Sequence, residues 1–157
     1  LQNILNYDYL WIRLRVKGGA YGCMSGFGRD GDCYMVSYLD PKLAETNEVY
    51  DKLPEYLEQF DQDERSMDRY VIGAISEMDI PKNPAALGVR GLTAYLSGIT
   101  REQLQKERDE VIDTDAKEIR ALVPYAKAVL SNNCLCVVGN ENKIKENSSL
   151  FTTVRSL

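Results

Sequence analysis

Histidine is absent from this 157-residue chain, and its absence excludes one class of metal chemistry. Zinc sites of the His-x-x-Glu-His type cannot be built without it. The chain also lacks any apolar run close to the ~20 residues that a membrane-spanning helix needs, so we expect no membrane partner. It carries no signal peptide, although a fragment could have lost one.

Basic residues are too few and too scattered for a nucleic-acid partner. The chain has 19 Lys and Arg against 24 Asp and Glu, which gives a formal net charge of −5. Phosphate binding needs a clustered basic face. The overall composition, 44% hydrophobic and 27% charged, is typical of a globular piece. A chain of this length buries on the order of two thirds of its unfolded surface, which predicts one domain over residues 1–157.

The N-terminal quarter of the chain predicts a helix followed by a β-hairpin. Apolar side chains recur with helical spacing through residues 1–15: Ile4, Leu5, Tyr7, Leu10, Trp11 and Leu14. Lys17-Gly18-Gly19 then ends the helix with a basic last turn and two residues that tolerate positive φ. Beyond them, Asp30-Gly31 separates two strand-like runs, residues 22–27 and 33–39. Asp-Gly in that setting is a strong hairpin signal.

A two-residue turn at Asp30-Gly31 would fix the register of this hairpin. It places Cys33 opposite Gly28. Cys23 falls opposite Tyr38, so the two cysteines are not expected to pair. The same register puts Tyr21 on one face with three residues of the second strand: Tyr34, Val36 and Tyr38. The other face of the first strand carries little side-chain bulk, so we expect a helix or another backbone to approach it closely.

The remaining two cysteines lie in an expected third strand, residues 134–138. Alternation along a strand puts Cys134 and Cys136 on one face, too close along the chain for an easy mutual disulfide. No pair of cysteines in the chain has the Cys-x2-Cys spacing of a structural zinc site. We therefore expect buried free thiols in a reducing compartment, assign the chain to the cytoplasm, and expect no metal ligand in it.

Beyond residue 39 the chain is mostly helical. Five helix starts are marked by proline or by capping pairs: Asp40-Pro41, Asp61-x-x-Glu64, Asn83-Pro84, Thr100-x-x-Gln103 and Asp115-x-x-Glu118. Internal prolines predict a kink or a restart at Pro54 and a kink at Pro124. A short terminal helix is expected over residues 141–146. The order predicts an α+β fold, with the hairpin and the third strand in one antiparallel sheet that several helices cover on one face.

The residues with most chemical character lie at the corner between the first helix and the hairpin. Arg15 ends the helix, Tyr21 begins the hairpin, and the glycines Gly18, Gly19 and Gly22 let the chain reverse. A phosphate-binding loop is excluded, because the lysine of this stretch precedes its glycines. Structural interpretations stay open: Arg15 as a cation that complements the helix dipole, Tyr21 as a core side chain, and the glycines as turn residues.

The residues around this corner resemble a known family. Asn6-Tyr7-Asp8-Tyr9-Leu10-Trp11, followed by Arg15-Val16-Lys17-Gly18-Gly19-Ala20-Tyr21-Gly22, is similar to the C-terminal half of the pitrilysin/insulinase superfamily of zinc peptidases, in its presequence-protease branch. There, a helix ending in Arg-x-Lys-Gly-Gly-Ala-Tyr-Gly belongs to the last of four homologous domains. The resemblance extends along the chain in the order of helix, hairpin and helices. It implies that these elements are part of a metallopeptidase-like α/β sandwich domain.

The resemblance also implies roles for two residues. In that family the Arg and the Tyr of this motif reach across a closed chamber to a peptide bound at a zinc site in the first domain. Carried over, Arg15 would grip backbone carbonyls of the substrate, and Tyr21 would be catalytic, donating to the oxyanion that forms during hydrolysis. Zinc would be the cofactor of the parent enzyme, bound by another domain, because this chain lacks the histidines of the family's metal motif.

We therefore interpret residues 1–157 as a single, N-terminally truncated, C-terminal domain of a larger peptidase that degrades unfolded peptides. The chain begins at Leu1 within the apolar helix, without an initiator Met and without the strands that precede this helix in the family. Its partners would be a peptide substrate and the other domains of the parent, and alone it would be inactive. The alternative is an inactive structural or assembly domain of the same superfamily. Retention of Arg15 and Tyr21 favours the enzyme part over this alternative. A free-standing small-ligand domain is disfavoured by the helix-first start, which leaves an expected sheet of only three strands.

Overall fold

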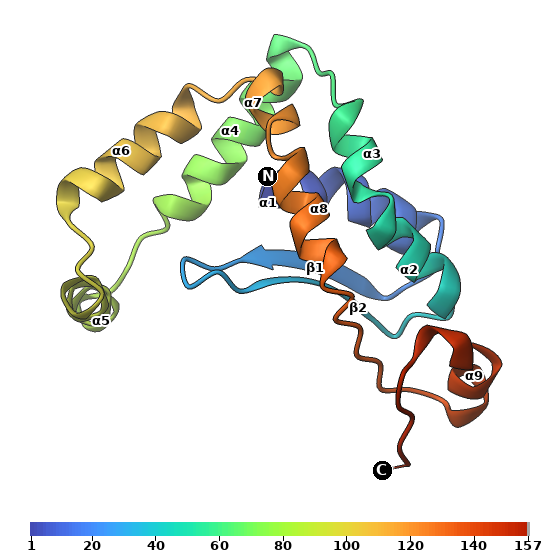
Figure 1. The fold of residues 1–157 in the computed structure, drawn as a ribbon. Helices are drawn as coiled ribbons and strands as arrows, with labels where there is room; N and C mark the ends of the chain where they lie inside the picture. Colours follow the sequence, from blue (N-terminus) through green and yellow to red (C-terminus); the bar gives the residue numbers. More distant parts are fainter. Residues whose placement is uncertain (157) are drawn as a thin grey trace. The chain divides into compact units, whose positions relative to one another are not determined.

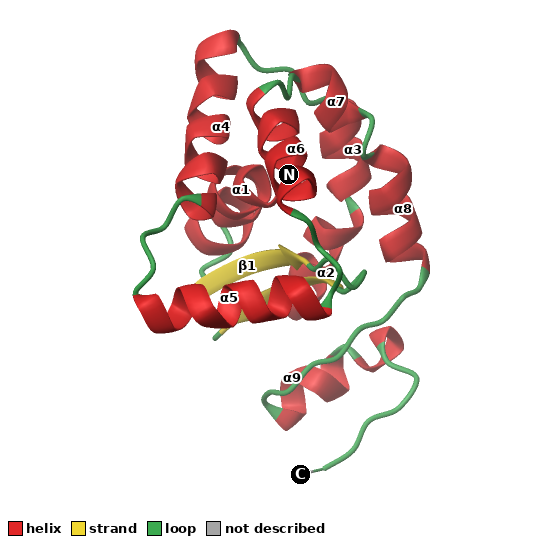
Figure 2. Cartoon of the chain, turned by 90° about the vertical axis from the view of Figure 1, so that its left-hand side faces the viewer, coloured by secondary structure: helices red, strands yellow, loops and turns green. Residues whose placement is uncertain are grey.

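The computed structural model describes residues 1–156, which form two compact units (Figure 1). The first combines Leu1–Phe60 with the chain from Arg120 onward, and the second is Asp61–Ile119. Helices predominate. The described residues contain one sheet of two antiparallel strands, β1 (Gly22–Phe27) and β2 (Cys33–Tyr38), both yellow in Figure 2. The predicted α+β class and the predicted hairpin are confirmed.

One run of helix opens the first unit and changes its winding along its length. α1 (Gln2–Ile4) leads into two π-helical stretches, η1 (Leu5–Tyr9) and η2 (Trp11–Val16). Backbone bonds there reach back five residues, as from the Lys17 N–H to the Ile12 carbonyl. The buried side chains confirm the predicted apolar helix: Ile4, Leu5, Tyr9, Leu10 and Leu14. Because a π-helix takes more residues per turn, two expected members of the apolar face are exposed: Tyr7 and Trp11.

The predicted register of the hairpin is wrong by one residue. Cys23 lies opposite Ser37, and Cys33 lies opposite Phe27. The two cysteines are unpaired, as expected, but their neighbours across the sheet are not those that a two-residue turn would give. A shift of one residue also moves every side chain of one strand to the other face relative to its partner strand.

The hairpin turn accounts for this shift. It covers residues 28–32 rather than two residues, and the Gly28 N–H donates to the Asp32 carbonyl at 2.7 Å. Inside the turn, the Asp30 carboxylate accepts from the Asp32 N–H at 3.2 Å, and Gly31 takes a positive φ of 92°. Asp-Gly therefore marks the turn correctly, but the side chain of Asp30 stabilises a longer loop.

The outer face of the hairpin is rich in tyrosine. Six residues of the two strands share this face: Gly22, Met24, Gly26, Tyr34, Val36 and Tyr38. The Tyr34 ring lies over Gly26, where an added Cβ would come within 2.5 Å of the ring. A side chain of β2 thus covers the part of β1 where we expected a helix or another backbone. On the inner face Ser25 is buried.

The later helices of the first unit pack on one another. α2 (Leu43–Asp51) ends and α3 (Leu53–Glu58) restarts around Pro54, which confirms the effect predicted for that proline. α8 (Val123–Ser131) lies beside α3 (Figure 1), and Lys127 pairs with Glu58 at 2.7 Å. Five buried side chains come from this region: Leu53, Leu57, Phe60, Val123 and Ala126.

A break takes the place of the kink expected at Pro124. α7 (Ala116–Arg120) ends before α8 begins, and Pro124 lies in the first turn of α8. The capping pair at the start of α7 is present, since the Glu118 N–H donates to the Asp115 carboxylate at 2.9 Å. The expected terminal helix is also confirmed as α9 (Glu141–Glu146), with the 3-10 turn η3 (Ser148–Leu150) after it.

The predicted third strand is wrong. Residues 134–138 have no regular secondary structure, and no strand within residues 1–156 pairs with them. An apolar run forms a strand only where a neighbour supplies hydrogen bonds for its backbone. Cys134 and Cys136 are consequently exposed. The prediction of buried thiols is wrong for these two and for Cys33, whereas Cys23 is half-buried and all four cysteines are free.

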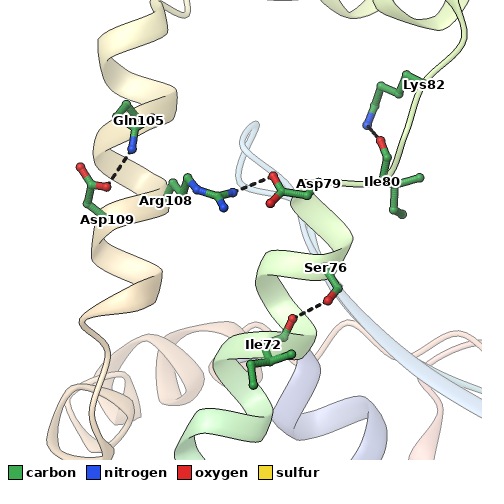
Figure 3. A network of polar contacts seen from close by, with 8 residues as sticks. All are labelled: Ile72, Ser76, Asp79, Ile80, Lys82, Gln105, Arg108 and Asp109. Carbon is green, nitrogen blue, oxygen red and sulfur yellow. Dashed lines mark hydrogen bonds and ion pairs between the residues drawn. The ribbon is translucent and has the colours of Figure 1, made fainter.

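Besides most of α7, the second unit contains three longer helices, each with a side-chain cap at its start. They are α4 (Glu64–Met78), α5 (Pro84–Leu96) and α6 (Arg101–Ile112). The caps of α5 and α6, Asn83 and Thr100, are those predicted, but α4 is capped by Asp63 instead of Asp61. Arg108 of α6 pairs with Asp79 at the end of α4 at 2.6 Å (Figure 3). None of the helices described in residues 1–156 has the length and apolar character needed to span a bilayer.

Candidate functional site

The candidate site is the corner that joins η2 to β1, and a buried polar contact fixes it. The side-chain oxygen of Asn6, Oδ1, accepts hydrogen bonds from the N–H and the hydroxyl of Ser25, at 2.6 and 2.8 Å. The Asn6 amide donates to the Ser25 carbonyl at 3.3 Å. Because Ser25 is only 2% exposed, these bonds replace water at a buried place and hold the helix against the hairpin.

Two glycines make the reversal of the chain possible. The Ala20 N–H donates to the Leu14 carbonyl at 2.9 Å, and the Gly19 N–H donates to the Arg15 carbonyl at 3.1 Å. This pattern is typical of a helix that ends in a left-handed residue, and Gly19 supplies it with φ 88°. A side chain at Gly18 would clash with the Leu14 carbonyl oxygen. The corner therefore needs glycine at both positions.

The third motif glycine has a different setting. Nothing lies within 4 Å of the place that a Cβ would take at Gly22. Gly22 is the first residue of β1 and pairs with Tyr38. Within the part of the chain that the structure describes, neither the backbone nor the packing requires glycine there.

Arg15 lies between two aromatic rings. Its guanidinium is 4.4 Å from the centre of the Trp11 ring and 5.7 Å from the centre of the Tyr21 ring. Its Nη1 donates a hydrogen bond to the Tyr21 carbonyl. A cation over an aromatic face is attracted by the negative face of the ring, so both contacts favour this position. The structure thus brings Arg15 and Tyr21 together.

Tyr21 is held by its backbone, whereas its hydroxyl is at the surface. The Tyr21 N–H donates to the Tyr38 carbonyl at 3.0 Å, and its ring meets the Tyr38 ring edge-to-face with centres 6.0 Å apart. The side chain is 66% exposed, so its interpretation as a core residue is wrong. Among residues 1–156 its hydroxyl has no hydrogen-bond partner. An exposed hydroxyl on a fixed backbone can donate to a ligand.

One thiol lies behind this corner. Cys23 is half-buried in β1, and burial raises the pKa of its thiol despite the opposing effect of the Arg15 charge. A raised pKa lowers the thiolate fraction, and the thiolate is the reactive and metal-binding form. Within residues 1–156 there is no group of three His, Cys, Asp or Glu side chains able to hold a metal ion. Histidine is missing from the sequence, so these residues could not form the His-x-x-Glu-His motif of the family.

Comparison with known proteins decides the family. The model of the PreP C-terminal domain family matches residues 1–139. The chain belongs to the PreP C-terminal domain family. The corner and the hairpin both lie inside the matched region, as do most of the helices.

Curated relatives of this PreP C-terminal domain are much longer proteins. The chain is 47% identical over 157 residues to Protein HypA of Clostridium perfringens, covering 100% of this chain and 16% of that protein. It is 30% identical over 158 residues to Presequence protease 1, chloroplastic/mitochondrial, of Arabidopsis thaliana, covering 98% and 15%. The mitochondrial presequence protease of Schizosaccharomyces pombe is 28% identical over 133 residues, covering 84% and 13%. The chain thus spans about a sixth of these relatives.

Sequence reasoning identified the ends of the corner but missed what holds it. Asn6 and Trp11 both belong to the string that carries the resemblance, but their contacts with Ser25 and Arg15 were not predicted. The spacing of four residues was the signal available for the contact between Trp11 and Arg15. A polar Asn on an otherwise apolar helix face was the signal available for the first contact. Nothing in the sequence distinguished Ser25.

Proposed function

We propose that this chain is the C-terminal domain of a zinc metalloendopeptidase that degrades unfolded peptides, in which it closes the chamber and supplies Arg15 and Tyr21 to the bound substrate. The observation that carries the proposal is the pairing of these two side chains at one exposed, glycine-fixed corner. Its membership of the PreP C-terminal domain family gives the reaction class. The partners are then a peptide substrate and the other domains of the parent protein.

Tyr21 is suited to stabilise charge in the transition state. Hydrolysis of a peptide bond places a negative charge on the carbonyl oxygen as the tetrahedral intermediate forms. A donor aimed at that oxygen acts mainly in the transition state, and loss of one such donor typically lowers kcat by about 10²–10³. The Tyr21 hydroxyl is exposed, and its ring is oriented by Tyr38 rather than by the hydroxyl.

Arg15 is suited to bind the backbone of the substrate. Its guanidinium carries five N–H donors in a fixed plane, and one hydrogen bond to the Tyr21 carbonyl leaves others for a ligand. Peptide carbonyls are present in the ground state and in the transition state alike. Arg15 therefore contributes to substrate affinity and to positioning more than to the chemical step.

The zinc of such an enzyme belongs to another domain. No histidine is present in this chain, and its own residues do not fit the metal, so the domain contributes binding and charge stabilisation only. Four free thiols support a reducing compartment, and we propose the cytoplasm. The relatives in Arabidopsis thaliana and Schizosaccharomyces pombe are named for organelles.

Site-specific photocrosslinking tests whether the corner meets the substrate. A photoreactive phenylalanine analogue at position 21 of the full-length protein should capture a labelled unstructured peptide. Position 125, an exposed tyrosine of α8 in the same unit, is the matched control. Strong labelling at 21 with little at 125 supports the proposal. Equal labelling at both positions, or none at 21, favours the alternative of a structural or assembly domain.

A further inference from the structure

We propose that Trp11 is a positioning residue that holds the Arg15 guanidinium at the corner for peptide binding. The inference rests on the proposed function, because it concerns how Arg15 is prepared for a substrate. It comes from one contact: the guanidinium lies 4.4 Å from the centre of the Trp11 ring, closer than its 5.7 Å from the Tyr21 ring. Trp11 is also the one tryptophan in the chain.

An exposed arginine needs such support to be ready for a ligand. Its long side chain rotates freely when unrestrained, and fixing it on binding reduces affinity. Here the Tyr21 carbonyl accepts from Nη1, and the Trp11 ring lies under the carbon of the same guanidinium, 4.4 Å away. A planar guanidinium stacks on an aromatic ring without using its N–H donors. The stack can therefore restrain Arg15 and leave donors for the peptide.

The helix itself is built to make this contact. Trp11 and Arg15 are the first and fifth residues of η2, and residues four apart lie on the same side of a helix. Leu10 and Leu14, their neighbours in the chain, are buried, whereas Trp11 is 38% exposed. Trp11 thus lies at the edge of the apolar face, where its ring can cover part of the core and carry a charged group above it.

The same helix offers a matched control. The Arg13 guanidinium lies 4.8 Å from the centre of the Tyr9 ring, again with a spacing of four residues. Tyr9 is buried and donates its hydroxyl to the Val49 carbonyl at 2.6 Å, so this second stack belongs to the core. The Arg13 guanidinium lies over the Tyr9 ring, and within residues 1–156 its side chain has no interaction with Arg15 or Tyr21. Arg13→Ala removes an equivalent stack without touching Arg15.

Kinetics of the full-length protein with an unstructured peptide test the functional part. Trp11→Leu should raise KM about two- to five-fold with little change in kcat, the range expected for a cation–π contact at an exposed site. Trp11→Phe, which keeps a ring, should recover part of the loss, and Arg13→Ala should leave KM unchanged. In an Arg15→Ala background Trp11→Leu should have no further effect, because Trp11 acts through Arg15.

Nuclear magnetic resonance of this chain tests the geometry without any activity. The indole shields protons above its face, so the side-chain resonances of Arg15 should move downfield in Trp11→Leu, while those of Arg13 should stay in place. Unmoved Arg15 resonances overturn the inference. So does a Trp11→Leu effect on KM that is equally large in the Arg15→Ala background. If Arg15→Ala itself leaves the kinetics unchanged, the proposed function fails as well.

Discussion

Asn6 and Ser25 are 19 residues apart, and three hydrogen bonds join them. They connect the first helix to β1 on the inner face of the hairpin. Asn6→Ala should reduce the free energy of unfolding by about 1–3 kcal/mol, because it leaves the buried N–H and hydroxyl of Ser25 without a partner. Urea denaturation checks this. A loss below about 0.5 kcal/mol, the range of an ordinary surface substitution, would show that water replaces Asn6.

The motif glycines should respond unequally to alanine. Gly19→Ala should cost about 1–2 kcal/mol, since φ 88° is unfavourable for a residue with a Cβ. Gly18→Ala should also destabilise, because the new Cβ clashes with the Leu14 carbonyl oxygen. Gly22→Ala is the control and should change stability little, since the space around it is open. Thermal melts of the three variants rank them. An equal loss of stability in Gly22→Ala would contradict this ranking, because it would mean that a side chain at Gly22 is not accommodated in open space.

Stability should fall at high pH because of a buried tyrosine. Burial raises the pKa of Tyr9 from 10.0 to about 12, although the nearby Arg13 charge lowers it. A group whose pKa is higher in the folded state stabilises the fold fully below pH 10, and this contribution is lost as the pH rises to 12. Tyr9→Phe should therefore reduce stability at neutral pH, through the lost bond to the Val49 carbonyl, and flatten its fall between pH 10 and 12. Denaturation at several pH values measures both effects, and an unchanged slope would contradict this account.

The chain on its own should neither hold zinc nor cleave peptides. It has no histidine, and its four cysteines are free. Metal analysis of the purified chain should find no stoichiometric zinc, and an assay with an unstructured peptide should find no hydrolysis. As a positive control, the full-length protein should give activity under the same conditions. One tightly bound zinc per chain would show that the cysteines come together in a way that the fold does not indicate.

Local signals predicted local structure well. Asn83, Thr100 and Asp115 were identified as helix caps, and the side chain of each accepts a hydrogen bond from the backbone N–H three residues ahead. Such contacts form between residues that are close together in the chain, so the local sequence pattern is enough to predict them. The same holds for the restart at Pro54.

Features that depend on distant partners were not predictable in this way. The register follows from a turn longer than Asp-Gly indicates, in which the Gly28 N–H bonds the Asp32 carbonyl, the Gly31 N–H bonds the Gly28 carbonyl and Gly31 is left-handed. The apolar run at residues 134–138 has strand character, but pairing requires a second strand. At the candidate site, sequence identified Arg15 and Tyr21 through the resemblance. The contact between the Trp11 ring and Arg15 was not predicted, although the two residues are four apart on one helix and such residues are neighbours on its surface.

The most direct test of the central claim is the steady-state kinetics of Tyr21→Phe in the full-length protein, with Tyr38→Phe as the control. Both residues are exposed tyrosines on neighbouring positions of the hairpin, and their rings touch. If the Tyr21 hydroxyl stabilises the oxyanion, its removal should lower kcat by about 10²-fold with little change in KM and melting temperature, while Tyr38→Phe stays close to wild type. Unchanged kinetics for Tyr21→Phe would contradict the account. So would a fall in melting temperature large enough to explain a lower rate, because the corner would then have a structural role only.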